Sequence, residues 1–230
     1  MSTAAGSSVI RGYTKIEGAA RALNFDFRDK TVLDIGSSTG GFTEYALKHG
    51  AKRVIAVEKG SHQMKAPLRF DPRIELHEKT DIFDVVAAGS TRTELRRAFA
   101  TTGANDEASP VTTGASEEAM RSPVLMLPTA PDIILADVSF ISLTKVLMYA
   151  KMNLARHGTQ FFVMLKPQFE AHPSELTRGV VKNEKYRRDI IKRFELWLKQ
   201  NDFIIVGKRD NQLQGKHGNL ERFYHLRLAR

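Results

Sequence analysis

TVLDIGSSTGGFT, residues 31–43, is the stretch that decides the fold of this sequence. It begins with the β-prone run Thr31-Val32-Leu33, reaches an acid at Asp34, and takes on a helical pattern from Phe42 onward. The turn between them holds three glycines, Gly36, Gly40 and Gly41. Glycine is needed where the backbone takes a positive φ or where a ligand approaches it closely. A strand, a glycine turn and a helix start form the unit that opens a nucleotide-binding α/β domain.

The spacing of these glycines excludes two common classes of nucleotide-binding loop. Gly36-x-x-x-Gly40-Gly41 is not the dinucleotide fingerprint G-x-G-x-x-G, and the turn lacks the Lys-Ser or Lys-Thr of a phosphate loop. An acid before the turn, Asp34, and a second acid closing the next strand, Glu58, fit S-adenosylmethionine better, because this molecule carries an ammonium group and two ribose hydroxyls. The positive end of the following helix would favour an electron-rich group. A tight turn without any ligand, and a plain surface position for Glu58, are the alternatives.

The composition excludes several classes of protein. The chain of 230 residues is long enough to bury a core, and it suits one domain or one domain with an appendage. It has no cysteine, which rules out disulfides, thiolate metal sites and cysteine nucleophiles and fits a reducing cytosol. The first ten residues show neither a basic start nor a long apolar run, and no window approaches about 18 apolar residues. We therefore expect a cytoplasmic protein without a signal peptide or a membrane span.

The charge balance favours a polyanionic partner. Lys and Arg together number 35 against 26 Asp and Glu, a formal net charge of +9. Neutralising phosphates releases counterions, so such a balance is typical of proteins that bind nucleic acid. The alternative is that the charge serves solubility alone.

Apolar runs alternate with helical patterns along most of the chain. Continuous apolar strands of this kind belong to a parallel sheet that is covered on both faces. Strands are predicted at 31–35, 53–57, 73–77, 132–136, 159–165, 203–206 and 221–228, and helices at 11–23, 41–49, 141–156 and 183–200. The last two strands form a hairpin. The sequence thus predicts an α/β, Rossmann-like fold with a seven-stranded, mostly parallel sheet, one antiparallel strand and helices on both faces.

Two segments fall outside this pattern. Residues 1–10 are expected to be disordered, with one domain over residues 11–230. From about residue 87 to residue 131 the sequence loses periodicity and is rich in Ser, Thr, Ala and Gly. A loop of this length is unusual inside a compact domain, so it is interpreted as a disordered or weakly helical insertion, after which the sheet resumes.

Four charged residues fall near the carboxyl ends of the predicted strands or on an element that can fold over them. In open parallel sheets ligands bind at that edge. The residues are Asp137, Lys166, Glu221 and, on the helix before the first strand, Lys15. With a second cation nearby, one of the two amines would more readily give up its proton, and the acids would hold and orient it. Such a set could remove the proton of a ribose 2′-hydroxyl as the oxygen is methylated. Two structural salt bridges, or a merely solvated Lys15, are the alternatives.

The ordered motifs resemble the hemolysin-A (TlyA-like) branch of the FtsJ-type RNA ribose methyltransferases. The resemblance covers residues 11–228 apart from the insertion, and it rests on Arg11-Gly-Tyr-Thr-Lys15, Asp34-Ile-Gly-Ser-Ser-Thr-Gly-Gly-Phe-Thr43, Asp137-Val-Ser-Phe-Ile-Ser-Leu143, Lys166-Pro-Gln-Phe-Glu-Ala171 and Gly218-Asn219-x-Glu221. It implies S-adenosylmethionine as cofactor, ribosomal RNA as substrate, typically at cytidine, and no metal. It also implies a Lys-Asp-Lys-Glu tetrad of Lys15, Asp137, Lys166 and Glu221.

Within this tetrad and around the cofactor, we expect individual residues to have distinct roles. Lys166 is expected to accept the proton, Asp137 to orient it, and Lys15 and Glu221 to tune charge and ribose position. The cofactor is expected to contact Asp34, Gly36, Ser37, Ser38, Gly40, Gly41, Phe42, Glu58, Lys59, Asp81 and Asp137.

The sequence also departs from this family. Members usually carry an N-terminal RNA-binding domain that this sequence does not contain, so a separate RNA-binding partner could replace it. Where members have Ser-Pro before the last motif, this chain has Asn211-Gln212, and the insertion is longer than expected. A catalytically silent RNA- or ribosome-binding protein of the same fold is the main alternative. A methyltransferase acting on a protein or small molecule, and a cytolysin as the family's older label suggests, are more remote.

Overall fold

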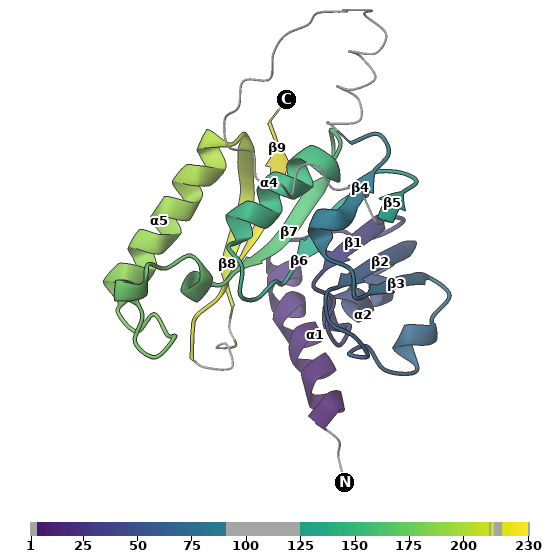
Figure 1. Ribbon diagram of the computed structural model, residues 1–230, viewed down its shortest axis with the longest axis horizontal. Coiled ribbons are helices and arrows are strands. Elements are labelled where there is room, and N and C mark those ends of the chain that lie inside the picture. Colours follow the sequence, from purple (N-terminus) through teal and green to yellow (C-terminus); the bar gives the residue numbers. More distant parts are fainter. Residues whose placement is uncertain (1–3, 91–124, 212, 214–217, 230) are drawn as a thin grey trace, which may run out of the picture.

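A seven-stranded sheet forms the centre of the molecule (Figure 1). The computed structural model describes residues 4–90, 125–211, 213 and 218–229. The strands follow the order β3-β2-β1-β6-β7-β9-β8, and only β9 runs antiparallel to its neighbours. Their bounds are β1 Thr31–Ile35, β2 Arg53–Glu58, β3 Ile74–Glu78, β6 Ile133–Ala136, β7 Gln160–Leu165, β8 Phe203–Asp210 and β9 Arg222–Leu228. The predicted fold class, a mostly parallel sheet with one antiparallel strand, is confirmed.

The order of the strands reverses at β1, which pairs with β2 on one side and β6 on the other. Ile35, the last residue of β1, lies beside Ala136, the last residue of β6, and Asp137 donates its backbone N–H to the Ile35 carbonyl over 3.3 Å. In a sheet of this kind the ligand crevice opens at the carboxyl ends of the strands beside such a reversal. The glycine turn after β1 and the acid after β6 therefore meet at one edge.

Helices cover both faces of the sheet, as predicted. On one face α1 (Ala4–Ala22) and α2 (Gly41–Lys48) pack on a core that contains Ile16, Tyr45 and Phe162. On the other face α4 (Leu143–Asn153) and α5 (Glu184–Gln200) pack on a second core that contains Leu147, Phe161 and Phe194. Phe161 and Phe162 are neighbours on β7 and serve opposite cores, because successive strand residues point to opposite faces.

The first helix begins earlier than the sequence predicted. α1 starts at Ala4, whereas residues 1–10 were expected to be disordered and the helix to begin at Arg11. Two alanines, Ala4 and Ala5, lie at its start, and alanine is the best helix former. Extending an existing helix adds one hydrogen bond per residue without a new nucleation step. Residues 1–3 lie outside the described residues.

The borders of the predicted insertion are ordered. β4 (Val85–Ala87) pairs in parallel with β5 (Leu125–Leu127) in a separate two-stranded sheet, and Leu127 is fully buried. Tyr149 of α4 donates its hydroxyl to the carbonyls of Phe83 and Val85 over 2.7 Å and 2.9 Å. The prediction of an insertion without a strand over residues 87–131 was wrong at its end, because the short apolar run at 125–127 was averaged into a polar window. Residues 91–124 lie outside the described residues.

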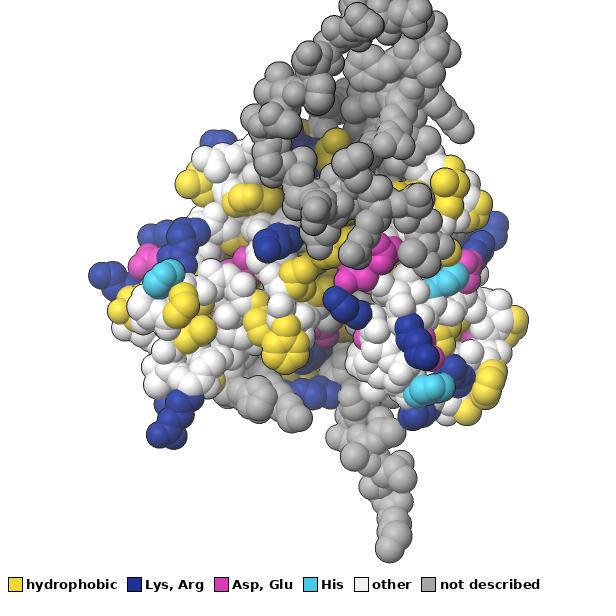
Figure 2. Space-filling view, in the orientation of Figure 1, with side chains coloured by type: hydrophobic (Ala, Val, Ile, Leu, Met, Phe, Trp, Pro, Cys, Tyr) yellow, Lys and Arg dark blue, Asp and Glu magenta, His cyan; other side chains and the backbone are white. Residues whose placement is uncertain are grey.

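Charged side chains cover much of the surface. Figure 2 shows Lys and Arg side chains spread over the face in view rather than gathered in one block. Many of them pair with a nearby acid, as in Lys48–Glu44 at 2.8 Å, Arg73–Asp71 at 2.7 Å and Arg193–Glu175 at 2.8 Å. Within the described part of the chain, none of the helices has both the length and the apolar character that crossing a bilayer requires.

Candidate active site

The glycine turn after β1 is hydrogen-bonded to the end of β2. Gly36 has a φ of 76° and Gly40 a φ of 91°, values that favour glycine, and the turn leads directly into α2. The backbone N–H groups of Gly36 and Ser37 donate to the Val57 carbonyl over 2.9 Å and 3.2 Å, and that of Ser38 donates to Glu58 Oε2 over 2.9 Å. The loop is thereby fixed to the neighbouring strand on the side where a cofactor would lie.

A pair of glycines brings α1 to this loop. Gly12 of α1 lies against Gly41 at the start of α2, and a Cβ on Gly41 would lie 2.8 Å from both Gly12 Cα and the backbone nitrogen of Tyr13. Real Cβ atoms do not approach backbone so closely, so glycine is required at this crossing. The contact places the next turn of α1, with Lys15, over the start of β9.

One pocket joins the loop, α1 and the end of β6. It is lined by Arg11, Gly12, Lys15, Gly36, Ser37, Ser38, Thr39, Gly41, Phe42 and Asp137. Two of the four predicted tetrad residues and six of the predicted cofactor residues are in this set. Arg11, Gly12 and Thr39 were not among the predicted site residues, although Arg11-Gly12 begins the motif that ends at Lys15.

Two buried polar atoms beneath the pocket suit a bound ligand. The Ser37 hydroxyl, which lines the pocket, and Asp34 Oδ1 are both buried and have no hydrogen-bond partner within the described residues. Such atoms are uncommon in folded proteins, because an unpaired buried polar group is costly. A ligand with hydroxyl and ammonium groups, such as S-adenosylmethionine, would satisfy them, so the residues present fit this cofactor.

Asp34 lies under the pocket rather than in its wall. Its side chain is fully buried, and its Oδ2 accepts a hydrogen bond from the Thr43 hydroxyl over 2.6 Å. Burial, opposed by this hydrogen bond, raises the pKa of Asp34 to about 7. In the structure Asp34 ties the first turn of α2 to the end of β1, and its contact with the cofactor stays a prediction.

Three other predicted cofactor residues lie beyond the pocket. Glu58 accepts hydrogen bonds from Ser38, from the Gly60 backbone over 2.7 Å and from the Gln63 amide over 3.1 Å. Lys59 Nζ lies 2.8 Å from Asp81 Oδ2, and Asp81 also caps the short 3₁₀ helix Ile82–Asp84. The carboxylate of Asp81 is thus occupied by local contacts. Gly40 does not line the pocket either, and Phe42 lines it while its ring packs 5.9 Å from that of Phe223.

The tetrad consists of two ion pairs at the carboxyl edge of the sheet. Lys15 Nζ lies 2.7 Å from Glu221 Oε2, and Lys166 Nζ lies 2.6 Å from Asp137 Oδ1. All four side chains are largely buried, and Lys15 and Asp137 line the same pocket, which connects the two pairs. The structure thus brings the four predicted residues together from α1, β6, β7 and β9. A buried ion pair is weak evidence for a purely structural role, since apolar residues would often stabilise as well.

Sequence reasoning missed several residues around the tetrad. Lys166 donates to the Ser139 hydroxyl over 2.9 Å, and the Asn211 amide donates to Glu221 Oε2 over 3.2 Å. Glu170 accepts from the Ser142 hydroxyl and the Leu143 backbone, both over 2.6 Å, and so anchors the start of α4. Burial raises the pKa of Glu170. Ser139 and Glu170 belong to motifs quoted above, whereas Asn211 was noted only as a departure from the family's Ser-Pro and was not assigned to the site.

Phe140 is the most unusual of these residues. Its side chain is 93% exposed and its backbone has a φ of 64°, a conformation rare for a non-glycine residue. The ring lies 5.3 Å from that of Phe169, next to Ser139 and near Asp137. An exposed aromatic held in a strained conformation beside charged, buried groups is typical of a substrate-contacting position. In the described ranges, no group of three or more His, Asp or Glu side chains could hold a metal ion.

Comparisons with known proteins agree with this geometry. A family model described as FtsJ-like methyltransferase matches residues 8–228. The chain is 30% identical over 219 residues to YqxC of Bacillus subtilis, named as a candidate rRNA methyltransferase, covering 95% of this chain but only 65% of that protein. It is 30% identical over 220 residues to the 16S/23S rRNA (cytidine-2′-O)-methyltransferase TlyA of Mycobacterium tuberculosis, covering 95% of this chain and 68% of the relative.

A solved structure shows the same fold. It is named as a candidate hemolysin from Streptococcus thermophilus and superposes with a TM-score of 0.72 at 29% identity, covering 95% of this chain and 66% of that one. This chain therefore spans about two thirds of the length of several proteins that it resembles.

Proposed function

The chain belongs to the FtsJ-like methyltransferase family, and from this premise we propose that it methylates the 2′-hydroxyl of a ribose in ribosomal RNA. The observation that carries the proposal is the meeting of two lysine–carboxylate pairs beside the pocket under the glycine turn. The name of the Mycobacterium tuberculosis relative, an rRNA (cytidine-2′-O)-methyltransferase, supports ribosomal RNA as substrate and cytidine as the nucleotide.

S-adenosylmethionine is the cofactor of this family, and when bound it supplies the methyl group on its sulfonium sulfur. Ser37, Asp34 and the glycine turn would hold its amino-acid part, and Glu58 at the tip of β2 would accept its ribose hydroxyls. Lys59 and Asp81 would lie near its adenine. The two buried atoms without partners support this placement.

Lys166 accepts the proton of the 2′-hydroxyl as the hydroxyl oxygen is methylated. Only a neutral amine can do so. Asp137 and Ser139 fix the direction of the Lys166 amine through contacts of 2.6 Å and 2.9 Å. After the transfer, the protonated Lys166 is paired with Asp137, so the developing charge is neutralised where it forms.

Glu221 and Lys15 hold the other side of the ribose. The Glu221 carboxylate binds Lys15 over 2.7 Å and accepts from Asn211, which keeps the pair rigid. Positioning of this kind is the main contribution that a protein can make to an in-line transfer. Phe140, exposed next to the tetrad, offers a face on which an unstacked base can lie, as RNA-binding proteins commonly provide.

The partners in RNA binding are also part of this proposal. We propose that the chain acts on ribosomal subunits and that a separate RNA-binding partner contributes affinity for them. A ribosomal substrate would also place the protein in the cytoplasm.

The test is methyl transfer from labelled S-adenosylmethionine to ribosomal subunits and to naked ribosomal RNA. Wild type and Lys166→Ala are compared side by side. Label that survives alkaline hydrolysis, as a 2′-O-methyl linkage must, and that is lost in the variant would support both the activity and the role of Lys166. No label on either substrate, with the cofactor still bound, would contradict the proposal and favour an RNA-binding protein without catalysis.

A further inference from the structure

A second hollow lies on the far side of Glu221 from the cofactor pocket. It is lined by Lys208, Arg209, Asp210, Asn211, Leu220 and Arg222, at the end of β8 and the start of β9. Leu220 and Arg222 flank Glu221 in the chain, and the Asn211 amide donates to Glu221 Oε2 over 3.2 Å. The hollow therefore shares a wall with the tetrad.

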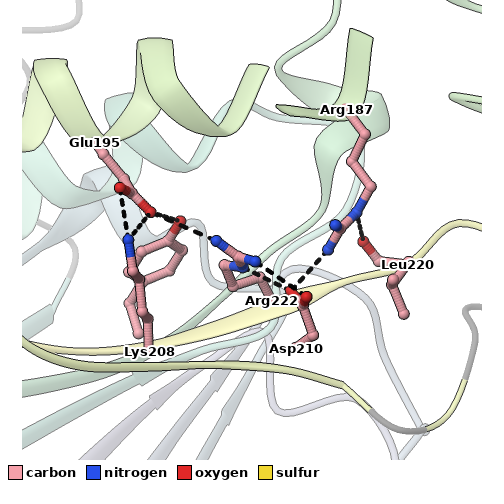
Figure 3. A network of polar contacts seen from close by, with 7 residues as sticks. Arg187, Glu195, Lys208, Asp210, Leu220 and Arg222 are labelled. Atoms are coloured by element: carbon pink, nitrogen blue, oxygen red, sulfur yellow. Dashed lines mark hydrogen bonds and ion pairs between the residues drawn. The ribbon is translucent and has the colours of Figure 1, made fainter. Parts of the chain in front are cut away.

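Three residues of the lining, Asp210, Leu220 and Arg222, belong to a fixed ion cluster (Figure 3). Arg222 binds Asp210 through two contacts, Nε to Oδ1 at 2.6 Å and Nη2 to Oδ2 at 3.0 Å. Arg187 of α5 donates to the same carboxylate over 2.7 Å and, through Nε, to the Leu220 carbonyl over 3.2 Å. Hydrogen bonds from Arg222 keep the pKa of Asp210 below its usual value, so this carboxylate stays ionised. The cluster keeps an excess of one positive charge and holds the backbone before Glu221.

Arg209 differs from its neighbours on β8. Lys208 is neutralised by Glu195 of α5, whose two oxygens lie 2.9 Å and 2.8 Å from Nζ. Because strand residues alternate, Arg209 projects from the opposite face of β8 to Lys208 and Asp210, which both contact α5. Arg209 is exposed, and its side chain forms no ion pair with any residue that the structure describes. The lining as a whole carries three cations against one carboxylate.

The hollow lies where an RNA strand would leave the tetrad. Along the carboxyl edge the cofactor pocket lies at β1, the tetrad at β6, β7 and β9, and the hollow at β9 and β8. Leu165, Arg222 and Asp210 form one row across these strands, directly before Lys166. An RNA strand that runs along this edge from a ribose at the tetrad toward β8 would pass over the hollow.

We infer that this hollow is a subsite for a phosphate of the RNA backbone next to the methylated ribose, with Arg209 as the main contact, because Lys208 and Arg222 are already paired with acids. The inference rests on the proposed function. A phosphodiester fits because the lining is polar and positive, and Leu220 is its one apolar member. Arginine binds phosphate through paired N–H groups, and such contacts position the strand without reading its sequence.

The test compares Arg209→Gln with Arg227→Gln in the full chain. Arg227 is also exposed and forms no ion pair with the described residues, but it lies at the other end of the same hairpin, at the amino edge of the sheet. Binding of a fluorescein-labelled single-stranded RNA of mixed sequence is measured over a series of KCl concentrations, with a second RNA of different sequence in parallel.

We expect the plot of log affinity against log salt to be shallower for Arg209→Gln than for wild type, by about 0.7 to 1, which is the contribution of one phosphate contact. The variant should also lower the affinity for both RNAs equally. The Arg227→Gln slope should equal that of wild type. A slope in Arg209→Gln equal to that of wild type and Arg227→Gln would overturn the inference. Methyl transfer by wild type is assayed in the same preparations, so loss of the subsite is distinguished from failure of the proposed function.

Discussion

At the scale of single residues, the tetrad differs from an ordinary pair of salt bridges in what its members touch. Lys166 contacts Asp137 at 2.6 Å and Ser139 at 2.9 Å, so an acid and a hydroxyl both direct its amine. Lys15 contacts Glu221, which is itself held by Asn211. A stabilising pair needs no such second layer of contacts, whereas a proton acceptor must be held in one direction.

Replacing Lys166 with arginine keeps the positive charge at this position but removes the group that could accept a proton. Lys166→Arg keeps a cation beside Asp137, but a guanidinium stays protonated and cannot act as a base. We expect methyl transfer to fall by about 10²- to 10⁴-fold, the usual contribution of a general base, while calorimetry shows nearly unchanged affinity for S-adenosylmethionine. Lys52→Arg, an exposed lysine before β2, is the control. Wild-type turnover in Lys166→Arg would exclude Lys166 as the proton acceptor.

The buried carboxyl group of Asp34 should make the stability of the folded protein depend on pH. Burial raises its pKa from 3.8 to about 7, so the folded protein favours the neutral acid. Between these values the unfolded chain ionises Asp34 while the folded chain retains the proton. The stabilisation is therefore full below about pH 4 and is lost as the pH rises toward 7, a change on the order of 4 kcal/mol.

Urea denaturation between pH 4 and pH 8 measures this effect. Asp34→Asn keeps an acceptor for the Thr43 hydroxyl but cannot ionise, so its unfolding free energy should fall less over this range than that of wild type. Asp29→Asn makes the same chemical change at an exposed position and should leave the wild-type dependence intact. Parallel curves for wild type and Asp34→Asn would show that Asp34 is not the group responsible.

The sequence predicted the four charged residues that the structure brings together, but not how they pair. Lys15, Asp137, Lys166 and Glu221 could be predicted because three adjoin apolar strands and one belongs to a motif. The exposure of Phe140 could not be predicted, because it depends on a positive φ set by surrounding packing. The buried state of Asp34 likewise follows from the tertiary fold.

At the scale of elements, the crossing of α1 and α2 decides whether the tetrad is complete. The two helices meet backbone to backbone at Gly12 and Gly41, and Lys15 lies one turn farther along α1. Every other tetrad residue is attached to the sheet. Lys15 is therefore the member that depends on a helix being correctly docked.

Gly41→Ala tests this dependence. Its Cβ would lie 2.8 Å from Gly12 Cα, so α1 must shift away, at a cost of about 1–3 kcal/mol for overpacking. We expect a lower thermal midpoint and a larger loss of turnover than of cofactor affinity, because Lys15 leaves Glu221. Gly12→Ala, whose Cβ would lie 3.2 Å from Gly41 Cα, should show a smaller effect of the same kind. Equal turnover in both variants and wild type would mean that the helix crossing does not position Lys15.

Elements with a strong hydrophobic pattern could be predicted from the sequence, whereas short elements that depend on tertiary contacts could not. Most strands of the main sheet were evident from an apolar run, and α5 was evident from its apolar stripe. β4 and β5 are three residues long, and they depend on their pairing, on the burial of Val85 and Leu127, and at β4 on the hydroxyl of Tyr149. A short strand of this kind carries too little local information to stand out from a polar segment.

At the scale of the whole molecule, the chain has a net charge of +9, and its cations differ in whether an acid lies beside them. Many surface cations are matched by an adjacent acid, so they contribute little to the long-range field. Of the cations that line the hollow on the proposed RNA path, Lys208 and Arg222 are paired with acids, whereas Arg209 forms no ion pair with a described residue. We therefore expect the attraction for RNA to come from the carboxyl edge of the sheet rather than from the surface in general.

Salt should weaken the binding of RNA much more than the binding of the cofactor. Each phosphate contact adds about 0.7 to the salt slope for a single-stranded RNA, so RNA affinity should fall steeply as KCl is raised. The cofactor carries no phosphate and enters a pocket lined largely by the glycine turn, so its affinity, measured by calorimetry in the same buffers, should change little. A parallel fall of both affinities would indicate a general effect on folding. A flat series for RNA, with cofactor binding intact, would contradict a nucleic-acid substrate for this chain.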